Sequence, residues 1–80
     1  ILEQVREALE LKVDIVLLDN MTLEMTRAAV ELARSTKTKL ESSGGLTLTT
    51  AASYAATGVD YLAVGAITHS APALDIGLDF

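Results

Sequence analysis

Three short segments of the chain have residue types suited to holding a phosphorylated sugar. They are Asp19-Asn20, Ser42-Ser43-Gly44-Gly45 and Gly65-Ala66. Glycines let a backbone approach an anion closely, and exposed amides at the N-terminus of a following helix donate to phosphate oxygens. A carboxylate such as that of Asp19 accepts hydrogen bonds from sugar hydroxyls or joins the shell of Mg²⁺. The two glycine-bearing segments therefore predict a phosphate cradle, with Asp19 beside it.

Each of these features can also be explained by a structural role alone. A Ser-Gly-Gly sequence is as readily a tight turn between a strand and a helix, and Asp19 could cap a helix. Two glycine-bearing loops on one edge of a sheet favour the phosphate site. His69-Ser70 could suggest acid-base or nucleophilic chemistry, but no orienting carboxylate is near in sequence and no nucleophile elbow is present. We expect His69 to be a polar loop residue near the site mouth, and Tyr54 and Tyr61 to pack rather than bind.

The elements that position these segments follow from the hydrophobic pattern, which alternates between extended and helical periods. Short apolar runs predict strands, although the second run is recognised as much by its place in the order as by its composition. These runs cover residues 14–19, 39–42 and 61–64. The first has no polar alternation, which is typical of a strand covered on both faces.

Helical stripes fill the intervals between the strands. They are expected over residues 2–10, from Thr22 to about Ser35, and from Leu48 to about Thr57. Thr22 and Thr47 offer N-caps, and Gly58 is expected at the C′ position of the third helix. After Pro72, residues 73–80 are expected to be irregular or partly extended.

Alternating strands and helices predict an α/β fold with parallel strands joined by right-handed crossovers. In such folds the loops at the carboxyl ends of the strands share one edge. Asp19, Ser43 and Gly65 are spaced by 24 and then 22 residues, about one strand-helix unit each. All three are therefore expected at that edge.

Composition narrows the function further. The chain has 80 residues, so we expect one domain at most, and its 50% hydrophobic content excludes disorder as the main state. Without cysteine and with one histidine, it has no thiolate site and no multi-histidine metal centre. A net charge of −5 argues against nucleic-acid binding. Neither a signal peptide nor a membrane-spanning run is evident, so we expect a soluble, cytoplasmic protein.

Five blocks of the sequence, in order and covering nearly all 80 residues, resemble one enzyme family. They are Asp-Ile-Val-Leu-Leu-Asp-Asn-Met (14–21), Glu-Ser-Ser-Gly-Gly-Leu-Thr (41–47), Tyr-Ala-Ala-Thr-Gly-Val-Asp-Tyr (54–61), Val-Gly-Ala-Ile-Thr-His-Ser (64–70) and Ala-Leu-Asp-Ile-Gly-Leu-Asp-Phe (73–80). They are similar to the C-terminal part of the quinolinate phosphoribosyltransferases, also called carboxylating nicotinate-nucleotide pyrophosphorylases.

The resemblance implies a fold and an activity. It implies parallel β/α units from the C-terminal part of an incomplete, seven-stranded, TIM-like barrel, with residues 1–80 forming no second domain. It also implies a pentosyltransferase of NAD biosynthesis, which converts quinolinate and phosphoribosyl pyrophosphate (PRPP) to nicotinate mononucleotide, pyrophosphate and CO₂ with Mg²⁺. A homodimer or higher homo-oligomer, whose sites are completed by the neighbouring subunit, is implied as well.

The resemblance also assigns roles to residues of this chain. Asp19 matches the acidic contact to the ribose and metal region. The phosphate-contacting loops match Ser43, Gly44, Gly45 and Gly65, and Ala66 would add a backbone amide. Residue 23 is Leu where the family often has Pro, a change that weakens the helix start without touching the site. No proton-transfer residue is identified.

One requirement of this chemistry is not met by the chain. Both substrates are polyanions, whose binding needs Arg and Lys in the site. All six basic residues are predicted away from the carboxyl-end loops, and the resemblance puts the family's basic cluster, with a Glu partner of Asp19, upstream of Ile1. We therefore interpret the chain as a barrel fragment that is inactive alone. Another phosphate-binding barrel enzyme, such as a thiamine-phosphate synthase-like protein, and a non-catalytic half-barrel association module are the alternatives.

Overall fold

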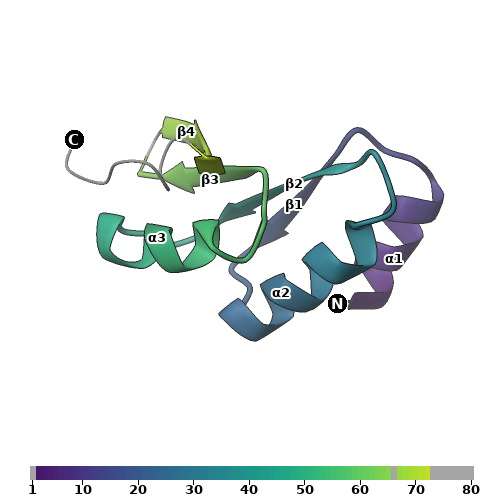
Figure 1. The fold of residues 1–80 in the computed structure, drawn as a ribbon, viewed down its shortest axis with the longest axis horizontal. Helices are drawn as coiled ribbons and strands as arrows, with labels where there is room; N and C mark the ends of the chain where they lie inside the picture. Colours follow the sequence, from purple (N-terminus) through teal and green to yellow (C-terminus); the bar gives the residue numbers. More distant parts are fainter. Residues whose placement is uncertain (1, 66, 73–80) are drawn as a thin grey trace.

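The computed structural model describes residues 2–65 and 67–72. Within these residues, three helices alternate with the strands of one sheet, and an additional strand follows (Figure 1). In chain order the elements are α1 (Leu2–Glu10), β1 (Ile15–Asp19), α2 (Leu23–Ala33), β2 (Lys39–Ser43), α3 (Leu48–Ala55), β3 (Tyr61–Val64) and β4 (Ile67–Ser70). Helices α2 and α3 each end about two residues earlier than the sequence predicts.

The sheet has the strand order β1-β2-β3-β4. Strands β1, β2 and β3 are parallel, and the register pairs Asp19 with Ser43 at the carboxyl ends of β1 and β2. The predicted α/β class with parallel β/α units is confirmed. This arrangement is consistent with the C-terminal part of a β/α barrel.

Strand β4 corrects the sequence prediction, which treated His69 as a loop residue. It pairs antiparallel with β3, and Val64 lies opposite Ile67. Only residues 65 and 66 connect the two strands, and Gly65 has φ +64°, the left-handed conformation that two-residue hairpin turns favour. Ile67-Thr68 supplies the β-branched residues that a strand favours. The prediction for residues 73–80 lies outside the described part of the chain.

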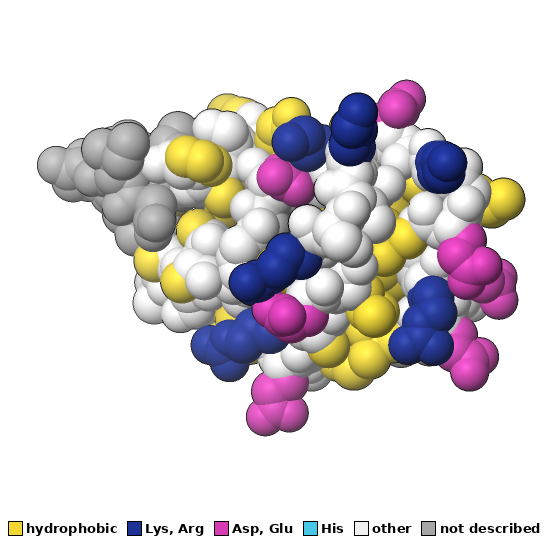
Figure 2. All heavy atoms as spheres, turned by 45° about the vertical axis from the view of Figure 1, so that its right-hand side comes forward, with side chains coloured by type: hydrophobic (Ala, Val, Ile, Leu, Met, Phe, Trp, Pro, Cys, Tyr) yellow, Lys and Arg dark blue, Asp and Glu magenta, His cyan; other side chains and the backbone are white. Residues whose placement is uncertain are grey.

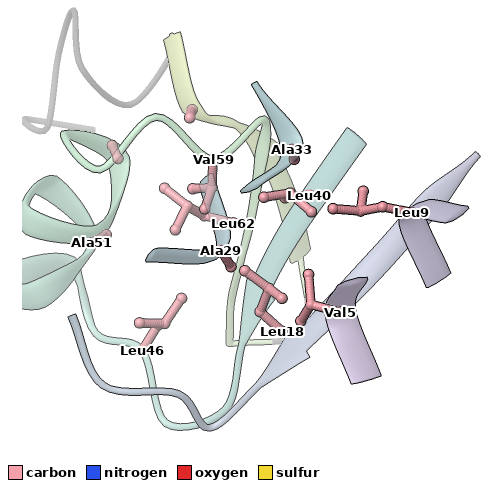
Figure 3. Close-up of a cluster of buried hydrophobic side chains, with 12 residues drawn as sticks. Val5, Leu9, Leu18, Ala29, Ala33, Leu40, Leu46, Ala51, Val59 and Leu62 are labelled. Atoms are coloured by element: carbon pink, nitrogen blue, oxygen red, sulfur yellow. The ribbon is translucent and has the colours of Figure 1, made fainter. Parts of the chain in front are cut away.

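The helices pack together on one face of the sheet, where they cover a single apolar core (Figures 1 and 3). Leu18, Leu40 and Leu62, one from each parallel strand, point into this core and are at most 2% exposed. Small residues of α2 and α3 let these helices approach the sheet closely: Ala29 and Ala51 are completely buried. The core thus fixes the face on which each strand residue lies.

The other face of the sheet is open in this chain. Ile15 and Leu17 are 53% and 57% exposed, while Val16 and Leu18 between them face the helices. The expectation that residues 14–19 are covered on both faces is therefore wrong for the described chain, because all three helices lie on the same side. An open apolar face agrees with the interpretation as a barrel fragment, whose remaining strands would enclose it.

The predicted N-caps of α2 and α3 are confirmed. The Thr22 hydroxyl accepts a hydrogen bond from Met25 N at 3.1 Å, and Thr47 forms a capping box with Thr50. Helix α3 is capped by Ala56, so Gly58 lies two residues beyond the cap rather than at the predicted C′ position. Among the described residues, none of the helices has the length and apolarity needed to cross a bilayer.

Candidate functional site

The carboxyl ends of the parallel strands bring three of the predicted site residues to one edge of the sheet. Asp19 is the last residue of β1, Ser43 is the last residue of β2, and Gly65 directly follows β3. Asp19 also lies on the same face as the exposed Ile15 and Leu17, since side chains alternate along a strand. The site therefore faces the open side of the sheet, which is the interior side in a closed barrel.

Asp19 and Ser43 are in direct contact. The Ser43 hydroxyl donates to Asp19 Oδ1 at 3.2 Å, and the backbone N–H of Asn20 donates to the Ser43 carbonyl at 2.9 Å. Helix α2 is capped by Thr22 and not by Asp19, so the structural alternative for this carboxylate is not realised. Its contact with Ser43 instead joins the loop after β1 to the loop after β2.

Gly44 allows the two loops to lie this close together. A Cβ at this position would lie 2.9 Å from Asn20 N and 3.1 Å from Asp19 Oδ1. The Asn20 backbone could not move away easily from such a Cβ, and the φ angle of Gly44 is +95°, which other residues rarely adopt. Glycine is therefore required here for both space and conformation.

The loop that follows Gly44 has the features of an anion site. Gly45 also has positive φ, but a Cβ there would meet nothing within 4 Å. Within the described part of the chain, the amides of residues 44–46 donate no hydrogen bond. Helix α3 begins at Leu48, so its N-terminal amides and positive dipole end are next to this loop. This geometry suits a phosphate group.

The third predicted loop differs from the second. The structure places Gly65 at the same edge, but strand β4 rather than a helix follows it, so no helix dipole acts there. Ala66 lies outside the described residues. Any contribution of Gly65 to anion binding would have to come from its backbone alone.

His69 does not join this group. It lies on β4 opposite Leu62, whose side chain is buried on the helix-covered face, so the register places His69 on the face away from Asp19 and Ser43. The prediction of a loop residue near the site mouth is wrong, because residues 67–70 form a strand. His69 and Ser70 are adjacent on β4, so their side chains point to opposite faces of the sheet.

Two contributions to the site were missed from the sequence. Asn20 adopts a left-handed conformation, with φ +60°, and its N–H donates to the Ser43 carbonyl. Asn is among the few residues that tolerate this conformation, and that is the signal its position offered. Tyr54, expected only to pack, also donates from its hydroxyl to the Met21 carbonyl at 2.8 Å. No sequence signal identified this bond.

The described site is poor in positive charge, as predicted. All six basic residues lie on α1, on α2, in the connections that precede β1 and β2, or at the start of β2: Arg6, Lys12, Arg27, Arg34, Lys37 and Lys39. In Figure 2, basic and acidic side chains are interspersed on the visible face and do not form one basic patch. A polyanion bound at the carboxyl edge would depend on loop amides from this chain and on cations from elsewhere.

The donor set for a metal is small. Among residues 2–65 and 67–72, no group of three or more His, Cys, Asp or Glu side chains could enclose an ion. Mg²⁺, however, commonly takes one or two carboxylates and completes its shell with substrate phosphates and water. Asp19 therefore fits a metal that bridges to a phosphorylated substrate, and does not fit a cage made by protein alone.

The nearest hollow is shallow and lies to one side of the site. It has a volume of about 390 Å³ and runs along the outer edge of β1 between α1 and α2. Asp19 and Asn20 contribute to its wall, but Ser43 and the glycines do not. The described residues therefore present an open half-site rather than an enclosed pocket.

Comparisons with known proteins agree with this geometry. The family model described as quinolinate phosphoribosyl transferase, C-terminal domain, matches residues 1–79. Nicotinate-nucleotide pyrophosphorylase (carboxylating) of Mycobacterium leprae is 54% identical over 80 residues, which cover 98% of this chain and 28% of that protein. The probable Bacillus subtilis enzyme of the same name is 38% identical over 77 residues, covering 96% and 26%. The Rattus norvegicus enzyme is 35% identical over 79 residues, also covering 96% and 26%. The chain thus spans less than a third of these relatives.

Proposed function

Since the chain belongs to the family of the quinolinate phosphoribosyl transferase C-terminal domain, we propose that it supplies the phosphate and ribose half-site of such an enzyme. The whole enzyme would convert quinolinate and PRPP to nicotinate mononucleotide, pyrophosphate and CO₂. The observation that carries this proposal is the contact of Asp19 with Ser43 and Gly44, immediately before the N-terminus of α3. It places a carboxylate and a glycine loop side by side, as a phosphorylated ribose requires.

Different residues of the half-site would bind different parts of the phosphorylated ribose. The amides of Gly44 and Gly45, with the dipole of α3, would bind the 5-phosphate. The Asp19 carboxylate would accept hydrogen bonds from ribose hydroxyls and hold Mg²⁺, while the Ser43 hydroxyl, which donates to Oδ1, would orient it. When bound, the metal would neutralise negative charge on the departing pyrophosphate. Gly65 and Ala66 would add backbone contacts.

The remaining groups would come from outside these 80 residues. Loss of pyrophosphate and of CO₂ both develop negative charge that positioned cations stabilise, and the described carboxyl-end loops carry no Lys or Arg. The proposed source is the rest of the barrel and a second subunit of a homodimer or higher homo-oligomer in the cytoplasm. The isolated chain is therefore expected to be inactive.

The test uses a chimera in which this chain replaces the matching 28% of the M. leprae relative. Formation of nicotinate mononucleotide by the chimera, abolished by Ser43→Asp, would support the proposal, because the new carboxylate repels phosphate and Asp19. A folded chimera without activity would contradict it. Calorimetric titration of the 80-residue chain with PRPP and Mg²⁺ then measures how much affinity this half-site contributes alone.

A second role, as a half-barrel that associates with itself, has one specific observation in its favour. The open sheet face exposes Ile15 and Leu17, which water-exposed sheets rarely leave uncovered. Gel filtration of the chain, compared with a Leu17→Lys variant, tests this role. A dimer that the substitution dissociates would support association, whereas two monomers of equal size would contradict it.

A further inference from the structure

One hydrogen bond connects helix α3 to the loop that follows Asp19. The Tyr54 hydroxyl, in the last turns of α3, donates to the Met21 carbonyl at 2.8 Å, and the two residues are 33 positions apart in sequence. The bond is partly buried, so water competes with it less than at a fully exposed position. It joins two elements that each contribute to the half-site.

The packing around Tyr54 holds its hydroxyl in one position. Its ring is half-buried and packs against the core, so the hydroxyl is held by a side chain that cannot swing freely. Met21 is also half-buried against the core. A tyrosine fixed at the ring therefore sets where the Met21 carbonyl lies.

The loop between β1 and α2 is thereby held from two sides. Its first residue, Asn20, donates from N–H to Ser43 O at 2.9 Å and has φ +60°. Its second, Met21, accepts from Tyr54. Asn tolerates the left-handed region but does not enforce it, so the loop depends on such external contacts to keep one conformation. Asp19 directly precedes this doubly held segment.

We propose that Tyr54 is a positioning residue of the half-site. Its hydroxyl holds the loop between β1 and α2 at a fixed distance from α3, whose N-terminal end faces the phosphate loop. The spacing between the carboxylate that meets ribose and metal and the amides that meet phosphate is then set by one side chain. This inference rests on the proposed function, and it adds a residue that itself touches no substrate.

The experiment removes the hydroxyl alone, by Tyr54→Phe in the M. leprae chimera. The expected result is about a tenfold fall in kcat/KM for PRPP, while kcat/KM for quinolinate at saturating PRPP stays near the parent value. The matched control is Tyr61→Phe, which removes the same atom from the first residue of β3, at the opposite end of the sheet. If Tyr54 only stabilised the fold, its substitution would lower kcat/KM for PRPP and kcat/KM for quinolinate together.

Hydrogen exchange at the Asn20 amide provides a readout independent of activity. Its exchange in the chimera should be about tenfold faster in Tyr54→Phe than in the parent and unchanged in Tyr61→Phe. Unchanged exchange, or an unchanged kcat/KM for PRPP, would overturn the inference. If the unsubstituted chimera is folded but inactive, the proposed function fails, and the exchange rates still decide the role of Tyr54 in holding the loop.

Discussion

The two ends of the parallel sheet use polar groups in opposite ways. At the amino end, Thr38 donates to the Val13 carbonyl at 2.7 Å, and the Asp60 carboxylate accepts from Leu40 N at 2.8 Å. Both bonds are partly buried. At the carboxyl end, the bond from Ser43 to Asp19 is longer, 3.2 Å, and exposed.

The difference shows which end is available for a ligand. The polar side chains at the amino end form hydrogen bonds between neighbouring segments of the chain. Substitutions of these side chains are therefore expected to alter stability. Polar groups at the carboxyl end lie in exposed loops, where the amides of residues 44–46 donate to no described acceptor. Changes to the polar side chains of Asp19 and Ser43 are therefore expected to alter binding. This is the division expected of β/α barrels.

The largest effect is expected from Gly44→Ala. Its Cβ would press on Asn20 N at 2.9 Å in a backbone with φ +95°, so we expect a loss of about 3 kcal/mol in the free energy of unfolding, with PRPP binding abolished. Urea denaturation and calorimetry measure the two quantities. The matched variant Gly45→Ala meets nothing within 4 Å and should cost only about 1 kcal/mol. Equal costs for the two would show that the loops are not in close contact.

At the amino end, Asp60→Ala sharpens the comparison. The variant leaves the Leu40 N–H without its acceptor, and we expect it to lower the free energy of unfolding by about 2 kcal/mol. Affinity for PRPP in the folded chimera should not change. Asp14→Ala, which removes an exposed carboxylate at the same end, controls for charge. A Kd raised by Asp60→Ala alone would break the division between the two ends.

In contrast to Asp60→Ala, Ser43→Ala should weaken PRPP binding with little change in stability. Because its hydrogen bond is exposed, stability should change by less than about 0.5 kcal/mol. The Kd for PRPP with Mg²⁺ should nevertheless rise about tenfold, since Asp19 loses the donor that orients it. Calorimetry on the chimera measures the Kd, and Ser43→Thr, which keeps the hydroxyl, should restore most of the affinity. Failure of threonine to do so would indicate a steric rather than a hydrogen-bonding role.

The smallest effect is expected from a substitution of Ser42, the residue before Ser43. Ser42 is 2% exposed, and its hydroxyl has no hydrogen-bond partner in the described structure. Ser42→Ala removes a buried polar group that gains nothing from its surroundings, so we expect stability to stay equal or rise by up to about 1 kcal/mol. Urea denaturation checks this. A clear loss of stability would reveal a partner for the hydroxyl and a polar role on the covered face.

Local sequence information was sufficient for much of the fold. The caps Thr22 and Thr47 and the order of the parallel strands were predictable, because caps and hydrophobic periods act over a few residues. Strand β4 was not, because its four residues carry a weak pattern and its position depends on pairing with β3. The open face of β1 followed only from the interpretation as a barrel fragment, since residues 15–18 are all apolar and do not themselves show which face is covered.

For the site, the sequence by itself determined the residue types and their order: Asp19, Ser43 and the glycines, each at the end of a strand. It did so because parallel strands necessarily place their carboxyl ends at one edge. Only the tertiary structure decided that Ser43 bonds to Asp19, that Gly44 must lack a side chain, and that Tyr54 holds the Met21 carbonyl. These contacts join residues 24 to 33 positions apart, and their geometry depends on how the helices pack on the sheet, which no local pattern encodes.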